Sequence, residues 1–344
     1  MDIELASKIS HTAKKIDGIV SSHLISETEK KSELSLRPTD FSHYIGQDYI
    51  KNNVSLMIDS ARSRNATLDH MLFSGPPGLG KTSLALLISK SMNVNHHVIS
   101  GPALEKKGDL ASILTQLQTG DILFIDEIHR LPISIEEILY SAMEDFRIDI
   151  IIGQGPSART MRIDLNAFSL IGATTKSGML SAPLRDRFVG NFHFEYYSSQ
   201  ELEKILAMNS KILNLNLSSS TLAHITERCR GTPRIANRVL RRIRDYCVVK
   251  NLVDLDKADL IQAFKLMDID SIGLDNLDRK FLKTMRDFYQ GGPVGIESMA
   301  ATLSEDRETL ETVVEPFLLK EGLIIRTSRG RVLTQKSLDH LGTI

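Results

Sequence analysis

Residues 75–82 read Gly-Pro-Pro-Gly-Leu-Gly-Lys-Thr, a spacing that could hold the phosphates of a nucleotide. The glycines would let the backbone fold around a phosphate and point its N–H groups inward, where a side chain would collide. Lys81 would reach the β- and γ-phosphates, and the Thr82 hydroxyl would hold Mg²⁺. The segment therefore predicts a site for ATP or another nucleoside triphosphate.

The residues on either side of this loop predict the elements that position it. The apolar run Met71–Phe73 reads as a strand, and Ser83–Ile88 reads as a helix whose N-terminus favours an anion. Because the loop joins a strand to a helix, a phosphate site is favoured over a chance Gly-rich turn.

Two acidic residues, Asp126 and Glu127, follow the apolar run Ile122–Ile125. Ligands bind at the carboxyl ends of strands in open α/β sheets, so these carboxylates would lie beside the phosphate loop. Asp126 would orient the Mg²⁺ shell, and Glu127 would polarise the attacking water. An isolated Asp-Glu pair is often only two solvated acids, but the preceding phosphate loop favours the catalytic interpretation.

Three further side chains are candidates for the γ-phosphate. Thr175 ends another predicted strand, although threonine also ends strands for packing reasons alone. Arg187 could complete the charge clamp from a neighbouring subunit, or it could form a surface ion pair with Asp186; both interpretations stay open. Arg234 follows a Gly-Thr-Pro turn and could bridge a helical domain to the phosphates.

The composition is that of a globular protein with about two to three domains. The chain has 344 residues, of which 42% are hydrophobic and 25% charged. It contains no apolar run of membrane-spanning length and no apolar signal core, so we expect a cytoplasmic protein. Cys229 and Cys247 lack metal-ligand spacing and fit buried thiols in a reducing compartment. The net charge of −1 hides an arginine cluster from Arg228 to Arg244, so only local clustering bears on nucleic acid.

We expect four segments: an extension (1–33), a large α/β domain (34–197), a small helical domain (198–270) and a winged-helix domain (271–344). The large domain alternates strands and helices, which predicts a parallel sheet with helices on both faces. A hairpin is predicted from Arg147–Ile152 and Ala158–Leu165. The predicted sheet strands are Met71–Ser74, His97–Ser100, Ile122–Ile125, Ser169–Ala173 and Asn191–Phe194.

The last segment has the pattern of a winged helix, with helices followed by two short strand-like runs. A third helix is expected to begin near Ser304, with Glu305 and Asp306 in its first turn. The other predicted elements are helices Asp278–Tyr289 and Ile296–Leu303 and strands Leu323–Thr327 and Arg331–Thr334.

In this order, the phosphate loop, acidic strand end, strand-end threonine, arginine pair and Gly-x-x-Arg resemble the AAA+ ATPases. More narrowly, the chain resembles the RuvB family of bacterial Holliday-junction branch-migration motors, from about Leu36 to Gly342. The strings that carry the resemblance are Leu36-Arg37-Pro38, Tyr44–Gln47, residues 75–82, Asp126–Arg130, Ile171–Thr175, Pro183–Phe188, Arg230–Asn237, Gly291–Gly295 and Arg326–Arg331.

The resemblance implies a hexameric ring that hydrolyses ATP between subunits and pumps duplex DNA from a four-way junction, in recombination and repair. It also implies the partners RuvA, which holds the junction, and RuvC, a resolvase. Arg187 corresponds to a finger acting on the neighbouring subunit, and Arg185 would assist it. Matching nucleotide-contact positions are Leu36, Arg37, Gly75, Gly78, Gly80, Lys81, Thr82, Ser83, Glu144, Asp145, Phe146, Tyr197 and Arg234. Matching positions near DNA phosphates are Arg307, Arg326, Arg329 and Arg331.

In this family the hairpin corresponding to Arg147–Leu165 docks on RuvA. Ile148, Ile150 and Ile152 alternate at period two and could present an apolar edge for docking, or this face could pack on its own core. The sequence departs from the family at Lys176, where arginine is usual, and at Val189-Gly190-Asn191 after the finger.

Other classes of function are less consistent with the sequence. A clamp loader or replication initiator is the alternative within AAA+, but the Ser-Arg-Cys finger and zinc-binding Cys cluster of many clamp loaders are absent. A nucleotide-switched winged-helix regulator is another, but Glu127 equips the site for turnover rather than for a pure switch.

Overall fold

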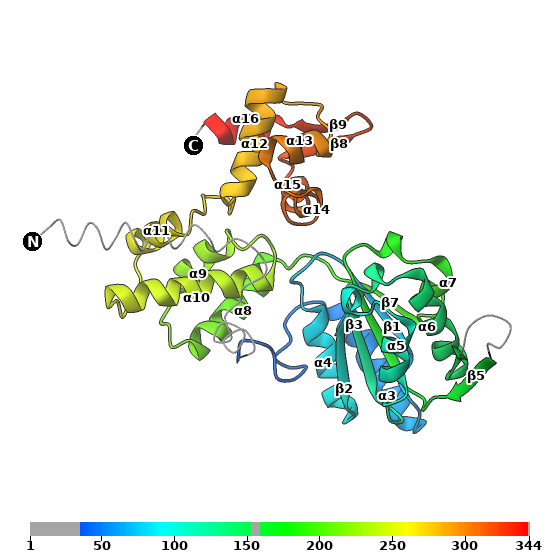
Figure 1. Ribbon diagram of the computed structural model, residues 1–344. Coiled ribbons are helices and arrows are strands. Elements are labelled where there is room, and N and C mark those ends of the chain that lie inside the picture. Colours follow the sequence, from blue (N-terminus) through cyan, green and yellow to red (C-terminus); the bar gives the residue numbers. More distant parts are fainter. Residues whose placement is uncertain (1–34, 153–158, 343–344) are drawn as a thin grey trace, which may run out of the picture. The chain divides into compact units, whose positions relative to one another are not determined.

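The computed structural model describes residues 35–152 and 159–342, which Figure 1 colours along the chain. The chain divides into two units, Met1–Arg37 and Pro38–Ile344. The predicted extension, 1–33, lies outside the described residues. In the described ranges, no helix combines the length and apolar character needed to cross a membrane.

A five-stranded sheet forms the centre of the first folded part of the second unit. Its order is β2-β3-β6-β1-β7, and every neighbouring pair is parallel. Because β6 lies between β1 and β3, the carboxyl ends that carry the phosphate loop, the acidic pair and the strand-end threonine meet at one edge. Each predicted strand is present close to its predicted ends: β1 (Met71–Ser74), β2 (His96–Ser100), β3 (Ile122–Asp126), β6 (Ser169–Thr174) and β7 (Gly190–His193).

Alternate side chains of the central strands enter two different hydrophobic cores. Met71 and Phe73 of β1 belong to one core, whereas Leu72 belongs to the other. A strand buried on both faces must supply apolar side chains to both, which explains the continuous apolar runs in the sequence. Helices α3 (Asp48–Ser63) and α4 (Lys81–Met92) pack in the first core, and α5 (Lys107–Leu114) and α6 (Ile133–Asp145) in the second.

A separate two-stranded hairpin follows α6. Strands β4 (Arg147–Ile152) and β5 (Arg159–Asp164) are antiparallel, as predicted, with Ile150 opposite Met161. The turn residues 153–158 lie outside the described residues. The remaining short elements of this part are η1 (Gly101–Ala103), η2 (Ile128–Arg130), η4 (Ser177–Met179) and α7 (Ala182–Arg185).

The second folded part consists of helices, as the sequence predicts. Ser198 caps α8 by accepting the Glu201 N–H, and Pro233 starts α10, where its missing N–H costs nothing. Residues of α9 and α10 belong to the same core as α3 and α4, so this part is packed against the sheet domain. The helices are α8 (Ser199–Ile212), α9 (Ser219–Thr226), α10 (Pro233–Lys250) and α11 (Lys257–Leu266).

The third folded part is a winged helix with a core of its own. The predicted helix start near Ser304 is wrong, because Ser304 has φ 54° and ends α13. Asp306 is instead the N-cap of α14 and accepts the Thr309 N–H, as a short acidic side chain at a helix start does. The elements are α12 (Asn276–Tyr289), α13 (Ile296–Leu303), α14 (Arg307–Thr309), the π-helical turn η5 (Leu310–Val314), α15 (Glu315–Lys320), β8 (Ile324–Thr327), β9 (Gly330–Leu333) and α16 (Gln335–Gly342).

Candidate nucleotide site and DNA-binding surface

Three positions of the phosphate loop accept only glycine. Gly75, Gly78 and Gly80 have φ of 131°, 79° and 97°, in the region that L side chains rarely adopt. A Cβ on Gly78 would lie 2.8 Å from the Cβ of Arg234, and one on Gly80 would lie 2.7 Å from the hydroxyl of Tyr44. These glycines therefore allow both the backbone curvature and the close approach of the surrounding elements.

Lys81, the first residue of α4, is only 8% exposed. Its Nζ donates to the carbonyl oxygens of Gly75 and Pro76, at 2.8 Å each. Burial lowers the pKa of Lys81 to about 8, and the negative charge of Asp126 partly offsets that effect. The ammonium group thus lies at the loop. Phosphate oxygens could replace the two carbonyl oxygens as acceptors of its hydrogen bonds.

Two buried tyrosines donate hydrogen bonds to the backbone of the phosphate loop. The Tyr197 hydroxyl donates to the Leu79 carbonyl at 3.2 Å, and the Tyr44 hydroxyl donates to the Gly80 carbonyl at 3.3 Å. Burial raises the pKa of Tyr197 to about 12, so it stays a donor at any physiological pH. Tyr44 was not predicted as a site residue, and its position within the Tyr44–Gln47 string was the one signal that could have indicated it.

The acidic pair lies at the end of β3. Asp126 accepts the Glu127 N–H at 3.0 Å, and Glu127 has a left-handed backbone, with φ 52°. The Glu127 carboxylate is 47% exposed and lies 3.3 Å from the Arg130 guanidinium. Glu127 therefore leaves the strand through a left-handed residue, and its carboxylate pairs with Arg130, three residues later.

The two threonines at the end of β6 have different surroundings. Thr174 is buried and hydrogen-bonded to His129 at 3.0 Å, whereas the predicted residue, Thr175, is exposed at the sheet edge. The Lys176 N–H donates to the Thr174 hydroxyl, and its ammonium lies 3.0 Å from Glu308. Thr174 therefore fixes the strand end, and Thr175 is free of the core and faces outward.

The turn before α10 meets the phosphate loop directly. The Arg234 N–H donates to the Gly78 carbonyl at 3.3 Å, and the Arg234 side chain is exposed. The structure therefore brings together the loop, Lys81, Asp126, Tyr197 and the Arg234 backbone. Leu36 and Arg37 belong to the other unit, Met1–Arg37, and their nucleotide contacts stay predictions.

Arg187 pairs with Glu144 rather than with Asp186, the partner considered from the sequence. Its Nη2 donates to Glu144 at 2.7 Å, its Nη1 donates to the Pro183 carbonyl at 2.7 Å, and its guanidinium lies 4.9 Å from the Tyr140 ring centroid. Two predicted nucleotide-contact segments, 144–146 and the finger, thus share one surface. In the segment that follows Arg187, the Val189 and Gly190 N–H groups both donate to the His70 carbonyl.

These three folded parts, in this order, match three sequence models of one family. Residues 36–194 match "Holliday junction DNA helicase RuvB P-loop domain", 197–270 match "RuvB AAA lid domain" and 271–342 match "RuvB C-terminal winged helix domain". The chain belongs to the RuvB family.

Known RuvB proteins are similar over nearly the whole chain. The "Holliday junction branch migration complex subunit RuvB" of Fusobacterium nucleatum is 52% identical over 321 residues, 92% of this chain and 97% of that protein. The protein of the same name from Limosilactobacillus reuteri is 50% identical over 325 residues, 94% and 96% of the two chains. A solved structure, the "Thermotoga maritima RuvB Holliday junction branch migration motor", has a TM-score of 0.83 at 44% identity and covers 90% of this chain.

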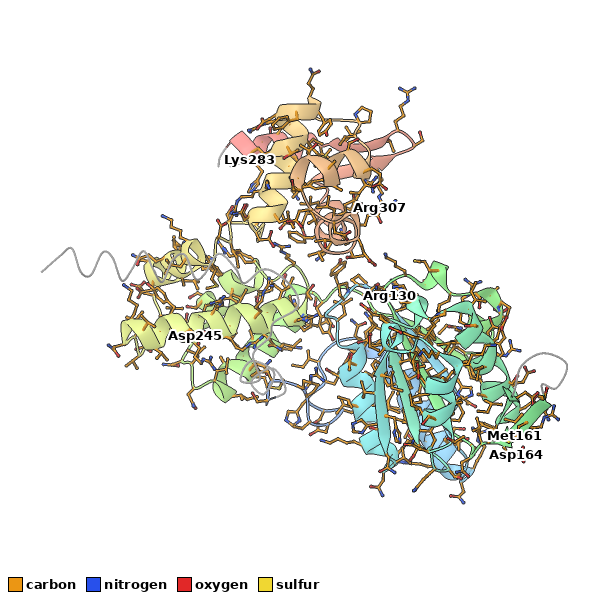
Figure 2. The ribbon with its side chains drawn as sticks, viewed as in Figure 1. Arg130, Met161, Asp164, Asp245, Lys283 and Arg307 are labelled. Atoms are coloured by element: carbon orange, nitrogen blue, oxygen red, sulfur yellow. The ribbon has the colours of Figure 1, made fainter. Side chains whose placement is uncertain are left out.

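The arginines predicted near DNA in this RuvB winged helix differ in their exposure. Arg307, labelled in Figure 2, is 54% exposed and pairs with Glu297 and Glu311. Arg326 is 53% exposed and lies 2.8 Å from Glu315. Arg331 is only 12% exposed and also pairs with Glu315, which is itself 1% exposed. Arg329, at the tip between β8 and β9, is exposed.

The predicted apolar docking edge of the hairpin needs a correction. Ile148 is 1% exposed and packs in the α5 and α6 core, because the base of the hairpin lies against the sheet domain. It is therefore unavailable to a partner. The Ile150 and Ile152 side chains lie outside those described. Met161, opposite Ile150, is 45% exposed on the hairpin (Figure 2).

The side chains at the sheet edge fit a magnesium–nucleotide complex. Among the described residues, no group of three His, Cys, Asp or Glu side chains is arranged to hold a metal by itself. Mg²⁺ commonly binds with one or two protein oxygens and the phosphates of its nucleotide. Thr82 and Asp126 supply that kind of donor set at the phosphate loop.

Proposed function

We propose that this chain is the ATPase subunit of a hexameric ring that drives branch migration of Holliday junctions. The observation that carries the proposal is the phosphate loop and acidic strand end at one sheet edge, followed by the lid and winged helix of the RuvB family. The named relatives act at Holliday junctions, and their high identity over almost the whole chain supports the same substrate here.

ATP would bind with its phosphates in the loop 75–82. Lys81 would exchange the carbonyl groups of Gly75 and Pro76 for the β- and γ-phosphate oxygens. Mg²⁺, held by Thr82 and oriented by Asp126, would neutralise charge on the same phosphates. The role of Ser83, next to Thr82 at the start of α4, would be to contact the phosphates from the helix N-terminus.

Glu127 would act as the general base for the attacking water, and Thr175 would position that water or sense the γ-phosphate. Both residues leave neighbouring strands, β3 and β6, at the same edge as the loop, and both are open to solvent. Arg234 would report the nucleotide state to the lid, because its backbone already contacts the loop. Proton acceptance needs a free carboxylate, so Glu127 would have to leave Arg130 during the cycle.

Arg187 would complete the site of a neighbouring subunit. Its pairing with Glu144 joins it to the segment Glu144–Phe146, whose positions match nucleotide contacts in the family. A single composite surface made by both segments suits presentation to an adjacent active site. The exposed Arg185, the last residue of α7 and two residues before Arg187, would assist it.

The winged helix would hold duplex DNA through its phosphates. Arg307, Arg326, Arg329 and Arg331 would supply positive charge without reading bases, as a motor acting on arbitrary sequences requires. RuvA would dock on the outer part of the β4–β5 hairpin, where Met161 is exposed, and RuvC would act downstream in the cytoplasm.

The test is migration of a synthetic four-way junction with ATP and Mg²⁺, with and without RuvA. Glu127→Gln is the control, because it should bind ATP without hydrolysing it. ATP-dependent migration that RuvA stimulates and Glu127→Gln lacks would support the motor. DNA-stimulated ATPase without junction movement would favour a clamp loader or initiator, and ATP binding with site-specific DNA affinity but no turnover would favour a nucleotide-switched regulator.

A further inference from the structure

The loop between α9 and α10 carries a buried arginine that has no role in the proposed chemistry. Arg230 is 8% exposed and has a left-handed backbone, with φ 56°. A bulky residue is rarely held in that conformation unless its surroundings require it. We therefore expect specific contacts to hold Arg230 in this conformation.

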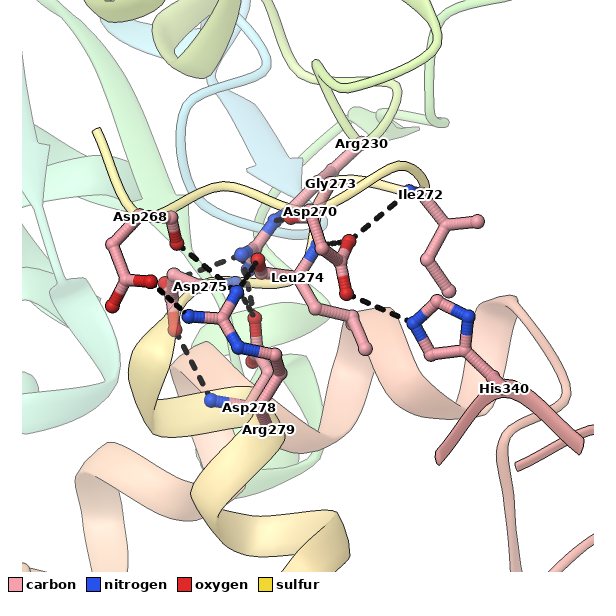
Figure 3. Close-up of polar contacts among 10 residues, drawn as sticks. All are labelled: Arg230, Asp268, Asp270, Ile272, Gly273, Leu274, Asp275, Asp278, Arg279 and His340. Atoms are coloured by element: carbon pink, nitrogen blue, oxygen red, sulfur yellow. Dashed lines mark hydrogen bonds and ion pairs between the residues drawn. The ribbon is translucent and has the colours of Figure 1, made fainter. Parts of the chain in front are cut away.

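Those contacts come from the linker between α11 and α12 (residues 267–275) and from the winged helix; Figure 3 shows the polar ones. The Arg230 Nε donates to the Gly273 carbonyl at 2.7 Å, and Nη2 lies 2.5 Å from Asp278 and 3.2 Å from Asp275. The guanidinium also lies 4.7 Å from the ring centroid of Phe317 in α15. One side chain of the lid thus binds a backbone carbonyl, two carboxylates and an aromatic face of the next domain.

The backbone of the same loop joins the winged helix to the phosphate loop. Lys320 of α15 donates to the Arg230 carbonyl at 3.4 Å, and its Nζ lies 4.5 Å from the centroid of the Tyr196 ring. The next residue, Tyr197, donates its N–H to the Gly231 carbonyl and its hydroxyl to the Leu79 carbonyl of the phosphate loop. A continuous run of contacts therefore connects the nucleotide site with α15.

The linker on the far side of Arg230 is braced as well. Arg279 pairs with Asp268 and donates to the Leu274 carbonyl at 2.8 Å. His340 of α16 lies 2.9 Å from Asp270, which also accepts the Leu274 N–H (Figure 3). Together these bonds tie the segment between α11 and α12 to both ends of the winged helix.

We propose that Arg230 is a positioning residue that fixes the winged helix to the lid, so that nucleotide-driven movement of the lid carries the DNA-binding domain with it. This inference rests on the proposed motor function, in which ATP hydrolysis displaces DNA. It adds the contact through which movement of the lid would reach the DNA-binding domain. Without the Arg230 side chain, ATP would still bind and be hydrolysed, but movement of the lid would no longer move the winged helix with it.

The chemistry of the pair explains why arginine is needed at this position. Burial raises the pKa of the Asp278 carboxyl, and the Arg230 guanidinium opposes that effect. Arginine reaches several acceptors at once with its planar fork, whereas lysine offers a single point charge. Arg230→Lys should therefore preserve charge but lose the bonds to Gly273 and one carboxylate.

The first experiment compares ATP turnover with junction migration in wild type, Arg230→Met, Arg230→Lys and Asp278→Asn. We expect DNA-stimulated ATPase within about twofold of wild type and migration reduced at least about tenfold in Arg230→Met, since the two processes are uncoupled. Arg230→Lys and Asp278→Asn, the milder changes, should be intermediate. Arg244→Met is the matched control, because Arg244 lies on α10 and pairs with Asp245 of the same helix, and both its rates should match wild type.

Parallel loss of ATPase and migration in all three variants would mean that Arg230 only stabilises the fold, and unchanged migration in Arg230→Met would mean that it couples nothing. Either result would overturn the inference.

The second experiment measures attachment without relying on any activity. Spin labels at Asp245→Cys in the lid and Lys283→Cys in α12 (Figure 2) report the distance between the two domains, with Cys229 and Cys247 buried. We expect one narrow distance distribution in the nucleotide-free, ADP and ATP-analogue states, and a broad one in the Arg230→Met background. Equal widths with and without Arg230→Met would overturn the inference. A wild-type protein that failed to migrate junctions would refute the proposed function, while these distances would still decide the attachment.

Discussion

The Glu127 carboxylate, the candidate general base, lies 3.3 Å from the Arg130 guanidinium in the same short helical turn. Both side chains are about half exposed, so the pair is worth no more than about 1 kcal/mol. Binding of nucleotide or DNA could therefore break this ion pair at a small cost in free energy.

Replacing Arg130 with glutamine should release Glu127. Because the pair contributes at most about 1 kcal/mol, we expect ATP turnover without DNA to rise by no more than about fivefold, with little change once DNA is present. Steady-state phosphate release with and without duplex DNA measures both rates. Arg244→Gln, which removes a partly exposed arginine from a pair with Asp245 on α10, is the control. A fall in basal turnover would show that Arg130 assists Glu127 instead.

Nucleotide affinity should depend on pH through Lys81. Burial lowers the pKa of Lys81 to about 8, and bound phosphates would raise it. Below pH 8 the ammonium is already charged, and above it binding must take up a proton, so the Kd for ATP should rise by about tenfold per pH unit above 8. Calorimetry with a non-hydrolysable analogue, in two buffers of different ionisation enthalpy, counts the protons taken up at pH 7 and pH 9.

The matched variant for this titration is Lys81→Arg, whose guanidinium stays charged across the range. It should take up no proton at pH 9. Equal proton uptake by wild type and Lys81→Arg would assign the pH dependence to another group.

Removing the Tyr197 hydroxyl should loosen the phosphate loop. Tyr197→Phe keeps the ring in its core but leaves the Leu79 carbonyl without this donor, at a cost of about 1–2 kcal/mol. We expect urea to unfold the ATPase domain at lower concentration and ATP to bind more weakly. Tyr49→Phe, on a side chain that is 75% exposed, should change neither. If both variants unfold like wild type, the hydroxyl does not support the loop.

The winged-helix arginines should divide into two kinds. Arg329→Ala removes an exposed charge, so DNA binding should weaken alike on all sequences and the salt dependence of log K should flatten by about one unit of slope. Arg331→Ala should also destabilise the domain, because Glu315, 1% exposed, loses one of its two arginine partners. Salt titrations of DNA binding and thermal unfolding separate the two effects. Destabilisation by Arg329→Ala would contradict the division.

The sequence predicted the elements that are set by local pattern. The central strands β1, β3 and β6 are predictable because they are buried on both faces and read as apolar runs. The phosphate loop is predictable because its spacing of glycines, lysine and threonine is specific. The helix start at Arg307 was misplaced because Ser304, Glu305 and Asp306 all favour a helix start, and only the left-handed backbone of Ser304 decides between them.

The parts of the site that join distant residues were not predictable. The residues next to Tyr44 do not indicate that its hydroxyl reaches the Gly80 carbonyl, and those next to Arg187 do not indicate that it pairs with Glu144 instead of Asp186. Both contacts depend on how the elements pack. Ile148 shows the opposite error: alternation at period two gives a shared face but does not say whether that face is covered. The segment boundaries, and the roles assigned to individual site residues, stay predictions.

The two cysteines have a consequence for the conditions in which the protein works. Cys229 is fully enclosed, and burial raises its pKa to about 12; burial also raises the pKa of Cys247. Oxidants attack thiolates, and neither residue forms one readily at neutral pH. Peroxide that damages DNA would therefore spare the two thiols of this subunit.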